Sequence, residues 1–422
     1  MSWALHFVLW MKRWKIASSS WLIIILYKLE SNSLYRKNQI KQLLMIVFFS
    51  VVLLVFFSAS WYVYSRGAKA LADTGFQRVF TWMYWGFSLM FILGQVLERG
   101  NPGLLAKMIS QVGSLWLAFF LYIFLFVVLV DVFRLIQYYF HVFPESLIHG
   151  IFLGKYLALS GLIVSLLITL MGFFNARNPV VRHFDLEIEK NKSQRDSLTL
   201  VLATDVHLGV LLGGKHAQKL VRMINEQNPD IVLFAGDLVD HNPVPVVKNN
   251  MGDCLAEIKA PMGVYAITGN HEFIGKAEVS INYFSKHGVQ YIRDSIFVIN
   301  NVIQIAGRED KDKPRFVGSE RKSLEKILQN RNPELPLILL DHQPVDYDLA
   351  EKENIDLMLS GHTHKGQLWP LGYITNLVYK NHYGLLKNGG TYFYTSSGFG
   401  TWGPTVRTGN RPELVVFKIH LK

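Results

Sequence analysis

The chain has little cysteine and little charge. Its 422 residues include one cysteine, Cys254, which excludes an intramolecular disulfide framework and a thiolate-based zinc cluster. Charged residues make up 18% of the sequence and hydrophobic residues 50%, whereas about 25% of an ordinary soluble domain is charged. Part of the chain is therefore expected to lie outside water. At about 150 residues per domain, the length predicts two or three structural units.

Acidic residues are scarce in the first half of the chain. Residues 1–196 contain 19 Lys and Arg against 9 Asp and Glu, whereas residues 197–422 contain 24 against 23. The net charge of +11 thus comes almost wholly from the first half, where the basic residues flank apolar runs. A nucleic-acid partner would need a basic face on a folded domain, so we expect none. Positive charge at the borders of a membrane is the favoured interpretation.

Four apolar stretches are long enough to cross a bilayer, which takes about 20 residues. None carries a charged residue at its centre, which argues against a transporter. We expect a basic N-terminal segment over 1–42 and a four-helix transmembrane region over 43–176, with the lipid bilayer as partner. The predicted spans are 43–64, 79–97, 114–133 and 152–174.

The membrane orientation follows from the basic residues. An even number of spans places both ends of the region on one side, and Lys and Arg are concentrated before the first span and after the last. The positive-inside rule then predicts a multi-pass protein of the cell membrane with the C-terminal part in the cytoplasm. The apolar run within residues 1–30 is too short to span, so we expect a segment lying on the membrane surface, or an over-extended start to the reading frame, rather than a fifth span.

The composition changes near Arg182, and we expect a linker over 177–196, whose polar stretch 183–196 has an entering edge strand as the alternative. Beyond them, short apolar runs alternate with helix-like polar stretches, which predicts α/β organisation for 197–422. Expected helices are 215–227, 275–287, 320–330 and 345–353. Expected strands are 198–203, 231–235, 263–267, 302–306, 337–340, 356–359, 391–395 and 414–419.

Five of these strands end in Asp, Asn or His. The carboxyl ends of strands in α/β sheets share one edge, where ligands bind. Oxygen and imidazole donors without thiolate suit hard or borderline divalent ions, and two such ions about 3.5–4 Å apart can clamp a phosphoryl group and activate water. Glycines before the donors allow sharp turns. The strand ends read Asp205-Val206-His207, Gly236-Asp237-Leu238-Val239-Asp240, Gly269-Asn270-His271-Glu272, Asp341-His342 and Gly361-His362-Thr363-His364.

This ordered set of motifs resembles the calcineurin-like metallophosphoesterase superfamily over residues 197–422. The stretch from Ser397 to Pro404, followed by Arg407 and Arg411-Pro412-Glu413, is similar to the membrane-associated bacterial branch of YkuE/YaeI type. The resemblance implies an α-helical membrane region followed by a two-sheet β sandwich flanked by helices.

The resemblance also implies roles for individual residues. Asp237 would bridge two divalent ions, with Mn, Fe, Zn or Co as candidates. His271 would protonate the leaving oxygen, and Asp240 would orient His271. The other implied ligands are Asp205, His207 and His364 for the first ion and Asn270, His342 and His362 for the second.

Several residues have alternative interpretations. His342, the most isolated of the set, could be a structural histidine, and Glu272 is expected to be an ion-pair or capping residue rather than a ligand. His241 is expected at the surface, with a contact to substrate as the alternative. For Arg407, a phosphate contact and a structural ion pair are equally open. Lys365 stands where members of the family often carry Gly, which bears on substrate preference.

The sequence therefore predicts a membrane-anchored binuclear-metal phosphoesterase. Its substrate would be a phosphodiester, a phosphomonoester or a pyrophosphate, lipid-linked or close to the membrane, and a protein phosphatase activity is a rival within the same class. The alternative is a non-catalytic membrane scaffold or sensor that uses a phosphoesterase-like domain to bind a ligand.

Overall fold

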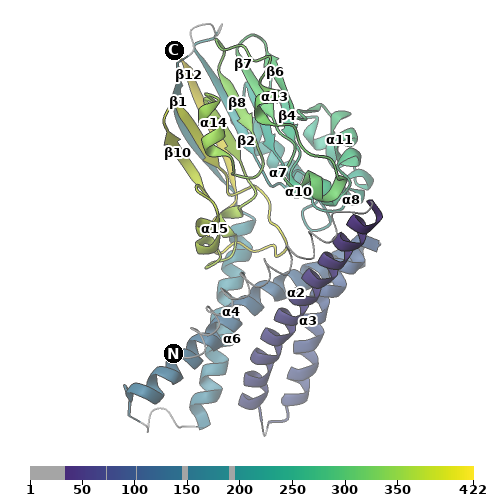
Figure 1. Cartoon of the computed structure of the whole chain (residues 1–422). Coiled ribbons are helices and arrows are strands. Elements are labelled where there is room, and N and C mark those ends of the chain that lie inside the picture. The colour runs from purple at the N-terminus through teal and green to yellow at the C-terminus, as the bar shows by residue number, and fades with distance from the viewer. Residues whose placement is uncertain (1–33, 73, 101, 145–150, 190–194) are drawn as a thin grey trace. The chain divides into compact units, whose positions relative to one another are not determined.

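The computed structural model describes the chain except residues 1–33, 73, 101, 145–150 and 190–194 (Figure 1). Most of the expected basic N-terminal segment therefore lies outside the described residues. The chain divides into two compact units, Met1–Ser65 and Arg66–Lys422. The described part of the first unit belongs to one helix, α2 (Leu34–Ala70), which continues into the second unit.

Four helices are long and apolar enough to cross a membrane, as the sequence predicts. They are α2, α3 (Gln77–Gly100), α4 (Leu104–Phe140) and α6 (Ile151–Ala176). Large apolar side chains on these helices are exposed, for example Leu129 by 66% and Leu167 by 60%. Apolar surface on this scale is unusual in a monomeric soluble protein, so we treat the four helices as membrane spans.

Small residues bring α3 and α4 close together. A Cβ on Gly113 would collide with the backbone of Phe91, and a Cβ on Gly94 would collide with Ser110. Close approach over small residues is typical of helix packing in membranes. Beside these positions the Trp116 indole donates a hydrogen bond to the Ser88 hydroxyl at 3.1 Å.

Residues 180–421 contain two six-stranded sheets, in the orders β1-β12-β2-β3-β4-β5 and β10-β11-β9-β8-β7-β6. In the first sheet, strands β2 to β5 are parallel and β12 runs antiparallel to β2. In the second sheet, β7, β8, β9 and β11 are parallel, and the edge strands β6 and β10 are antiparallel to their neighbours. The strands are β1 (Val180–Ile188), β2 (Ser197–Ala203), β3 (Ile231–Ala235), β4 (Val264–Ile267), β5 (Val289–Tyr291), β6 (Ser295–Ile299), β7 (Ile303–Gly307), β8 (Leu337–Leu340), β9 (Leu357–Ser360), β10 (Gly384–Asn388), β11 (Thr391–Thr395) and β12 (Glu413–Leu421).

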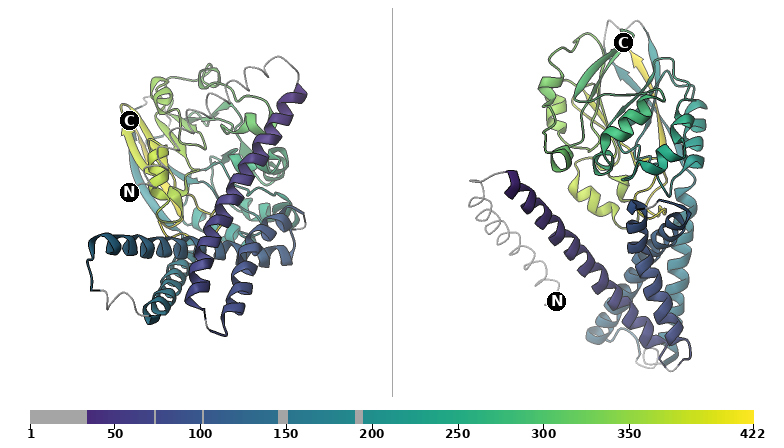
Figure 2. Two further views of the ribbon diagram at one scale, coloured as in Figure 1. Left: turned by 60° about the horizontal axis from the view of Figure 1, so that its bottom comes forward. Right: turned by 90° about the vertical axis from the view of Figure 1, so that its right-hand side faces the viewer.

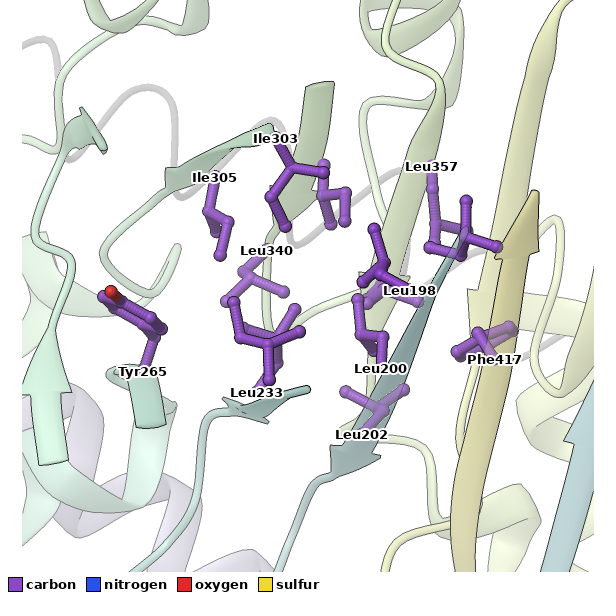
Figure 3. Packing of buried hydrophobic residues seen from close by; sticks show 14 of the residues in the cluster. Leu198, Leu200, Leu202, Leu233, Tyr265, Ile303, Ile305, Leu340, Leu357 and Phe417 are labelled. Atoms are coloured by element: carbon purple, nitrogen blue, oxygen red, sulfur yellow. The ribbon is translucent and has the colours of Figure 1, made fainter. Parts of the chain in front are cut away.

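The core lies between the two sheets (Figure 3). Leu200 and Leu233 from one sheet meet Ile305 and Leu340 from the other, and all four are fully buried. The opposite faces of the sheets are covered by helices: α7 packs on the first sheet, and α13 and α14 pack on the second. The helices are α7 (Gly214–Asn225), α8 (Val244–Lys248), α9 (Met251–Leu255), α10 (Asn270–Ile274), α11 (Ala277–Ser285), α12 (Lys313–Val317), α13 (Leu324–Ile327), α14 (Tyr347–Lys352) and α15 (Gly372–Val378).

The two-sheet sandwich flanked by helices is therefore confirmed. All eight expected strands are present, with shifts of one or two residues at their ends. The stretch 177–196 contains β1, which pairs along its length with β12. Of the two expectations for this stretch, a linker or an edge strand, its described residues include an edge strand. The helix expected over 320–330 is shorter, because only Leu324–Ile327 is helical.

Candidate metal centre and catalytic residues

The polar residues expected at the strand ends gather at one edge of the sandwich. Both sheets contribute: β2, β3 and β4 lead into one half of the donors, and β8 and β9 lead into the other half. The structure brings together all seven predicted ligands and both predicted catalytic residues. These are Asp205 and His207 after β2, Asp237 and Asp240 after β3, Asn270 and His271 after β4, His342 after β8, and His362 and His364 after β9.

One group of donors surrounds the Nε2 atom of His364. The Asp205 Oδ1 atom lies 3.3 Å from it and the His207 Nε2 atom 3.1 Å from it. The Asp237 Oδ2 atom completes the group at 3.9 Å from His207 Nε2. Ligands bound at about 2.0–2.2 Å to one ion are separated by distances of this order. The buried Asp205, His207 and His364 can therefore hold a divalent ion, and Asp237 lies beside them.

A second group shares the same Asp237 oxygen. The His342 Nε2 atom lies 3.1 Å from Asp237 Oδ2, and His362 Nδ1 lies 3.0 Å from Asn270 Oδ1. The other ring nitrogen of His342, Nδ1, lies 2.8 Å from the Ala235 carbonyl oxygen. A carbonyl only accepts, so Nδ1 donates there and Nε2 is free to bind a metal when the ring is neutral.

The backbone at the donors is strained. Five of them have positive φ: Asp205 (50°), His207 (52°), Asp237 (53°), His362 (71°) and His364 (48°). This left-handed region is sparsely populated by residues other than glycine. Each such residue costs about 1–3 kcal/mol and persists only where the surrounding structure imposes it, as at functional sites. Five of the seven predicted ligands therefore lie in this region, which other described residues outside the motifs, such as Asn228 and Asn300, also adopt.

Most of the glycines in the motifs are needed because a side chain at their position would collide with a neighbouring residue, not because the backbone turns there. Gly236 has a φ of 90°, as expected for a turn that only glycine adopts readily. At Gly269, with a φ of −103°, a Cβ would collide with Asp237. At Gly361 it would collide with the Asp205 carboxylate. The explanation by sharp turns is therefore correct for Gly236 and wrong for Gly269, which is glycine because a ligand packs against it.

His271 lies beside the donors and is held by two carboxylates. Its Nδ1 atom is 2.9 Å from Asp240 Oδ1, and its backbone N–H donates to Asp237 Oδ1 at 2.8 Å. Burial lowers the pKa of His271, but the charge of Asp237 and the hydrogen bond to Asp240 outweigh it and raise the pKa to about 9. The imidazole therefore carries a proton at neutral pH, with Nδ1 donating to Asp240 and the Nε2 proton available to a substrate.

Glu272 caps the loops that carry the donors. It is fully buried, and its carboxylate accepts hydrogen bonds from the backbone N–H groups of Asp237, Val239 and Gly269 at 3.1, 2.9 and 2.7 Å. Of the expected roles, the structure gives it capping. Burial raises its pKa to about 7.

Arg407 fits neither of the roles expected for it. It is fully buried, and its guanidinium donates to the Gly400 carbonyl at 2.6 Å and to the Gly398 carbonyl at 3.2 Å. Its Nη2 atom also lies 3.2 Å from His364 Nδ1. Arg407 thus fixes the closing loop beside the ring of a predicted ligand. Its backbone-directed contacts are invisible in a sequence motif.

Asp310 is a buried carboxylate that the sequence interpretation missed. It follows β7 at the same edge of the second sheet, accepts a hydrogen bond from Gln343 at 3.0 Å, and has its pKa raised to about 6 by burial. The signal was present, because the strand expected at 302–306 also runs into polar residues, Arg308-Glu309-Asp310.

His241 is not a simple surface residue. Its Nδ1 atom lies 3.1 Å from Asp240 Oδ1, and its Nε2 atom lies 3.6 Å from the carboxylate of Glu98. Glu98 is buried and belongs to the last turn of α3. The last turn of a membrane helix therefore reaches the residue that orients His271.

Comparison with known proteins agrees with this geometry. The family model described as calcineurin-like phosphoesterase matches residues 198–366. An uncharacterized metallophosphoesterase of Campylobacter jejuni is 30% identical over 390 residues, covering 89% of this chain and 99% of its own length. A zebrafish transmembrane protein with metallophosphoesterase domain is 31% identical over 64% of this chain and 63% of its own length. YkuE of Bacillus subtilis is 27% identical over 53% of this chain and 79% of its own length.

Proposed function

Because the chain belongs to the calcineurin-like metallophosphoesterase family, we propose that it is a membrane-anchored phosphoesterase that works with two divalent metal ions. The observation that carries the proposal is the position of Asp237. One of its carboxylate oxygens faces both donor groups, at 3.1 Å from His342 and 3.9 Å from His207. A carboxylate shared in this way is suited to bridge two ions.

The donor set fits two ions. Asp205, His207, Asp237 and His364 would hold the first, and Asp237, Asn270, His342 and His362 the second. Metal binding requires neutral imidazoles. Burial lowers the pKa of His207 to about 3 and that of His362 to about 4, so both rings are unprotonated at neutral pH. The charge of Asp237 outweighs burial at His342 and raises its pKa, so an ion bound there would displace a proton from this ring. The mixed oxygen and nitrogen donors suit Mn, Fe, Zn or Co.

When bound, such ions polarise phosphoryl oxygens and lower the pKa of water. The two carboxylates among the ligands leave the pair of ions with net positive charge, which favours an anionic substrate. His271 donates the Nε2 proton to the departing oxygen, and Asp240 holds the ring by its Nδ1 proton. The buried edge limits access of bulk water, since Asp205 and Asp237 are 0% and 2% exposed.

The substrate would be a phosphodiester, a phosphomonoester or a pyrophosphate, lipid-linked or presented close to the membrane. The membrane helices support this because they adjoin the site: Glu98 of α3 faces His241, and Gln111 of α4 donates a hydrogen bond to Thr405 at 2.8 Å. The basic residues around the spans support a multi-pass protein of the cell membrane with the site on the cytoplasmic side. The complete ligand set favours an enzyme over a non-catalytic scaffold or sensor.

The test is Mn²⁺-dependent hydrolysis of bis-p-nitrophenyl phosphate by the full chain in detergent. We expect Asp237→Asn to abolish it, since both ions lose a ligand. His271→Ala should cost about 10²–10⁴-fold with an unactivated alcohol as leaving group, and much less with p-nitrophenolate, which departs without a proton. Wild-type activity in Asp237→Asn would reject the bridging role.

A further inference from the structure

A cleft joins the predicted metal centre to the membrane helices. Its volume is about 160 Å³, and it reaches His207 and Asp240 at one end. One wall comes from α3 and α4, and the other comes from residues 211–212 and the loop 401–405. The apolar residues of the lining are Phe91, Leu117, Leu211, Leu212, Trp402 and Pro404.

The apolar wall belongs to the membrane-spanning helices. Phe91 precedes Glu98 by seven residues in α3, which is about 10 Å along a helix. Leu117 lies in the apolar part of α4. The hydrogen bond between Gln111 and Thr405 holds the loop 401–405 against α4, and Figure 2 shows α3 and α4 meeting this end of the sandwich. The cleft thus runs from the donors to apolar side chains of two helices that we treat as membrane spans.

We propose that this cleft takes the apolar part of a lipid-type phosphoester whose phosphate lies at the donor groups. The inference rests on the proposed function and makes it narrower, because it selects an amphiphile over a soluble phosphate ester. The polar end of the cleft is formed by His207, Asp240, His241 and Glu98, and Gln95 lies one turn before Glu98 in α3. Phe91 and Leu117 form the apolar end. The two ends match the phosphate and the alkyl chain of such a molecule.

The size of the cleft favours this occupant. Its volume equals about five water molecules of 30 Å³, whereas pockets that enclose a whole small ligand measure about 300–1,000 Å³. A molecule held only by its few carbons nearest the phosphate fits, provided that the remainder lies in the bilayer. Each methylene buried in the transition state is expected to raise kcat/KM about fourfold.

The test uses two substrates with the same leaving group, methyl p-nitrophenyl phosphate and dodecyl p-nitrophenyl phosphate. The full chain is assayed with Mn²⁺ in one detergent, so that the micelle is constant. We expect wild-type kcat/KM for the dodecyl ester to exceed that for the methyl ester by at least tenfold. Leu117→Trp, which fills the cleft from α4, should reduce this ratio at least fivefold, and Leu212→Trp should do so from the opposite wall.

The matched control is Leu129→Trp, on the same helix at a side chain that is 66% exposed and outside the cleft lining. It should keep the wild-type ratio, and metal content equal to wild type identifies folded variants. A wild-type ratio near one, or equal ratios in all three tryptophan variants, overturns the cleft. Failure to hydrolyse either ester overturns the proposed function itself.

A different observation concerns α15, which exposes apolar side chains on the sandwich. Within this short helix Tyr373, Ile374, Leu377 and Val378 are exposed by 68%, 58%, 87% and 68%. The preceding Trp369 is exposed by 56%, and its carbonyl accepts a hydrogen bond from Tyr122 of α4 at 3.1 Å. The helix is thus attached to a membrane span.

We infer that α15 lies in the membrane interface, with Leu377 among the lipid chains. Exposed Trp and Tyr beside aliphatic residues are the composition of the headgroup region. The hydrogen bond between Tyr122 of α4 and the Trp369 carbonyl places α15 next to a helix that we treat as a membrane span.

The inference is tested with an environment-sensitive nitrobenzoxadiazole label on single cysteines in a Cys254→Ser background, using the full chain in nanodiscs with doxyl-labelled lipids. We expect the label at Leu377→Cys to lose more than half its emission, as at Leu167→Cys in α6. The label at Val298→Cys, in edge strand β6, should keep its emission. Quenching at Leu167→Cys combined with none at Leu377→Cys overturns the placement of α15.

Discussion

The membrane helices and the sandwich use the same apolar residues in opposite ways. Leu167 of α6 is 60% exposed, whereas Leu200 and Leu340 in the sandwich are fully buried. In both regions the leucine side chains lie in apolar surroundings. These surroundings are lipid for the helices and the space between the two sheets for the sandwich. An average composition of 50% hydrophobic residues therefore combines two regions that obey opposite rules.

Charged residues separate the two regions as well. The sandwich buries Asp205 and Asp237 at one edge, and burying a carboxylate is costly unless it is paired or bound to a metal. The spans carry no charge near their centres. Buried carboxylates elsewhere in the sandwich, such as Asp341 and Glu413, are paired with arginine, whereas we propose that ions offset the cost at this edge. The exposed apolar side chains of α15 depart from the rule of the sandwich, and its attachment to α4 accounts for that departure.

The largest effect is expected from Leu200→Asp, which places a carboxylate in the apolar space between the sheets. The expected loss of stability exceeds about 4 kcal/mol, and no folded sandwich should be recovered. Leu200→Met, which keeps the volume, should cost less than about 1.5 kcal/mol. Thermal unfolding of the full chain in detergent measures both. A folded Leu200→Asp protein with unchanged Tm would contradict the buried core.

The next effect compares two exposed positions. Leu167→Asp faces lipid near the middle of α6, where an acidic residue costs about 2.5–3.5 kcal/mol on insertion scales. Val298→Asp, at a side chain that is 48% exposed on the sandwich, should cost less than about 1 kcal/mol because it faces water. The fraction of chain resisting alkaline extraction from membranes reports the first cost, and Tm reports the second. If both aspartate substitutions were equally well tolerated, Leu167 would not face lipid while Val298 faces water, and the account would be contradicted.

The smallest effect compares two glycines. A Cβ at Gly361 would collide with the Asp205 carboxylate, whereas nothing lies within 4 Å of a Cβ at Gly86 in α3. Gly361→Ala should weaken Mn²⁺ binding about 10–100-fold, as expected when the support of a ligand is disturbed, and Gly86→Ala should leave it unchanged. Titration of Mn²⁺ by calorimetry measures the difference. Wild-type affinity in Gly361→Ala would show that Asp205 is not a ligand.

The sequence was most informative where periodicity and motif coincide. The buried runs that lead into Asp205, Asp237 and His362 mark both a strand and a candidate ligand, so the strands and the gathering of these residues at one edge could be predicted together. The weak elements were missed because β10 and β5 have mixed burial patterns and α12 and α15 have only five and seven residues. Their structure depends on neighbours in space rather than on a local period.

The residues that support the donors were predicted less well. Arg407 acts through carbonyl groups of Gly398 and Gly400, which any residue could offer. Glu98 belongs to a membrane helix 143 positions before His241, and no motif links the two. The collision at Gly361 also depends on two loops from different sheets. These contacts join residues that are far apart in the sequence. They can be identified only when the three-dimensional fold is known.

The most direct test of the central claim is the metal content of the purified full chain, measured by inductively coupled plasma mass spectrometry after dialysis against Mn²⁺. The account predicts two equivalents of divalent metal per chain, and at most one in Asp237→Asn. No bound metal in the wild-type chain, or two equivalents retained in Asp237→Asn, would contradict a pair of ions bridged by Asp237.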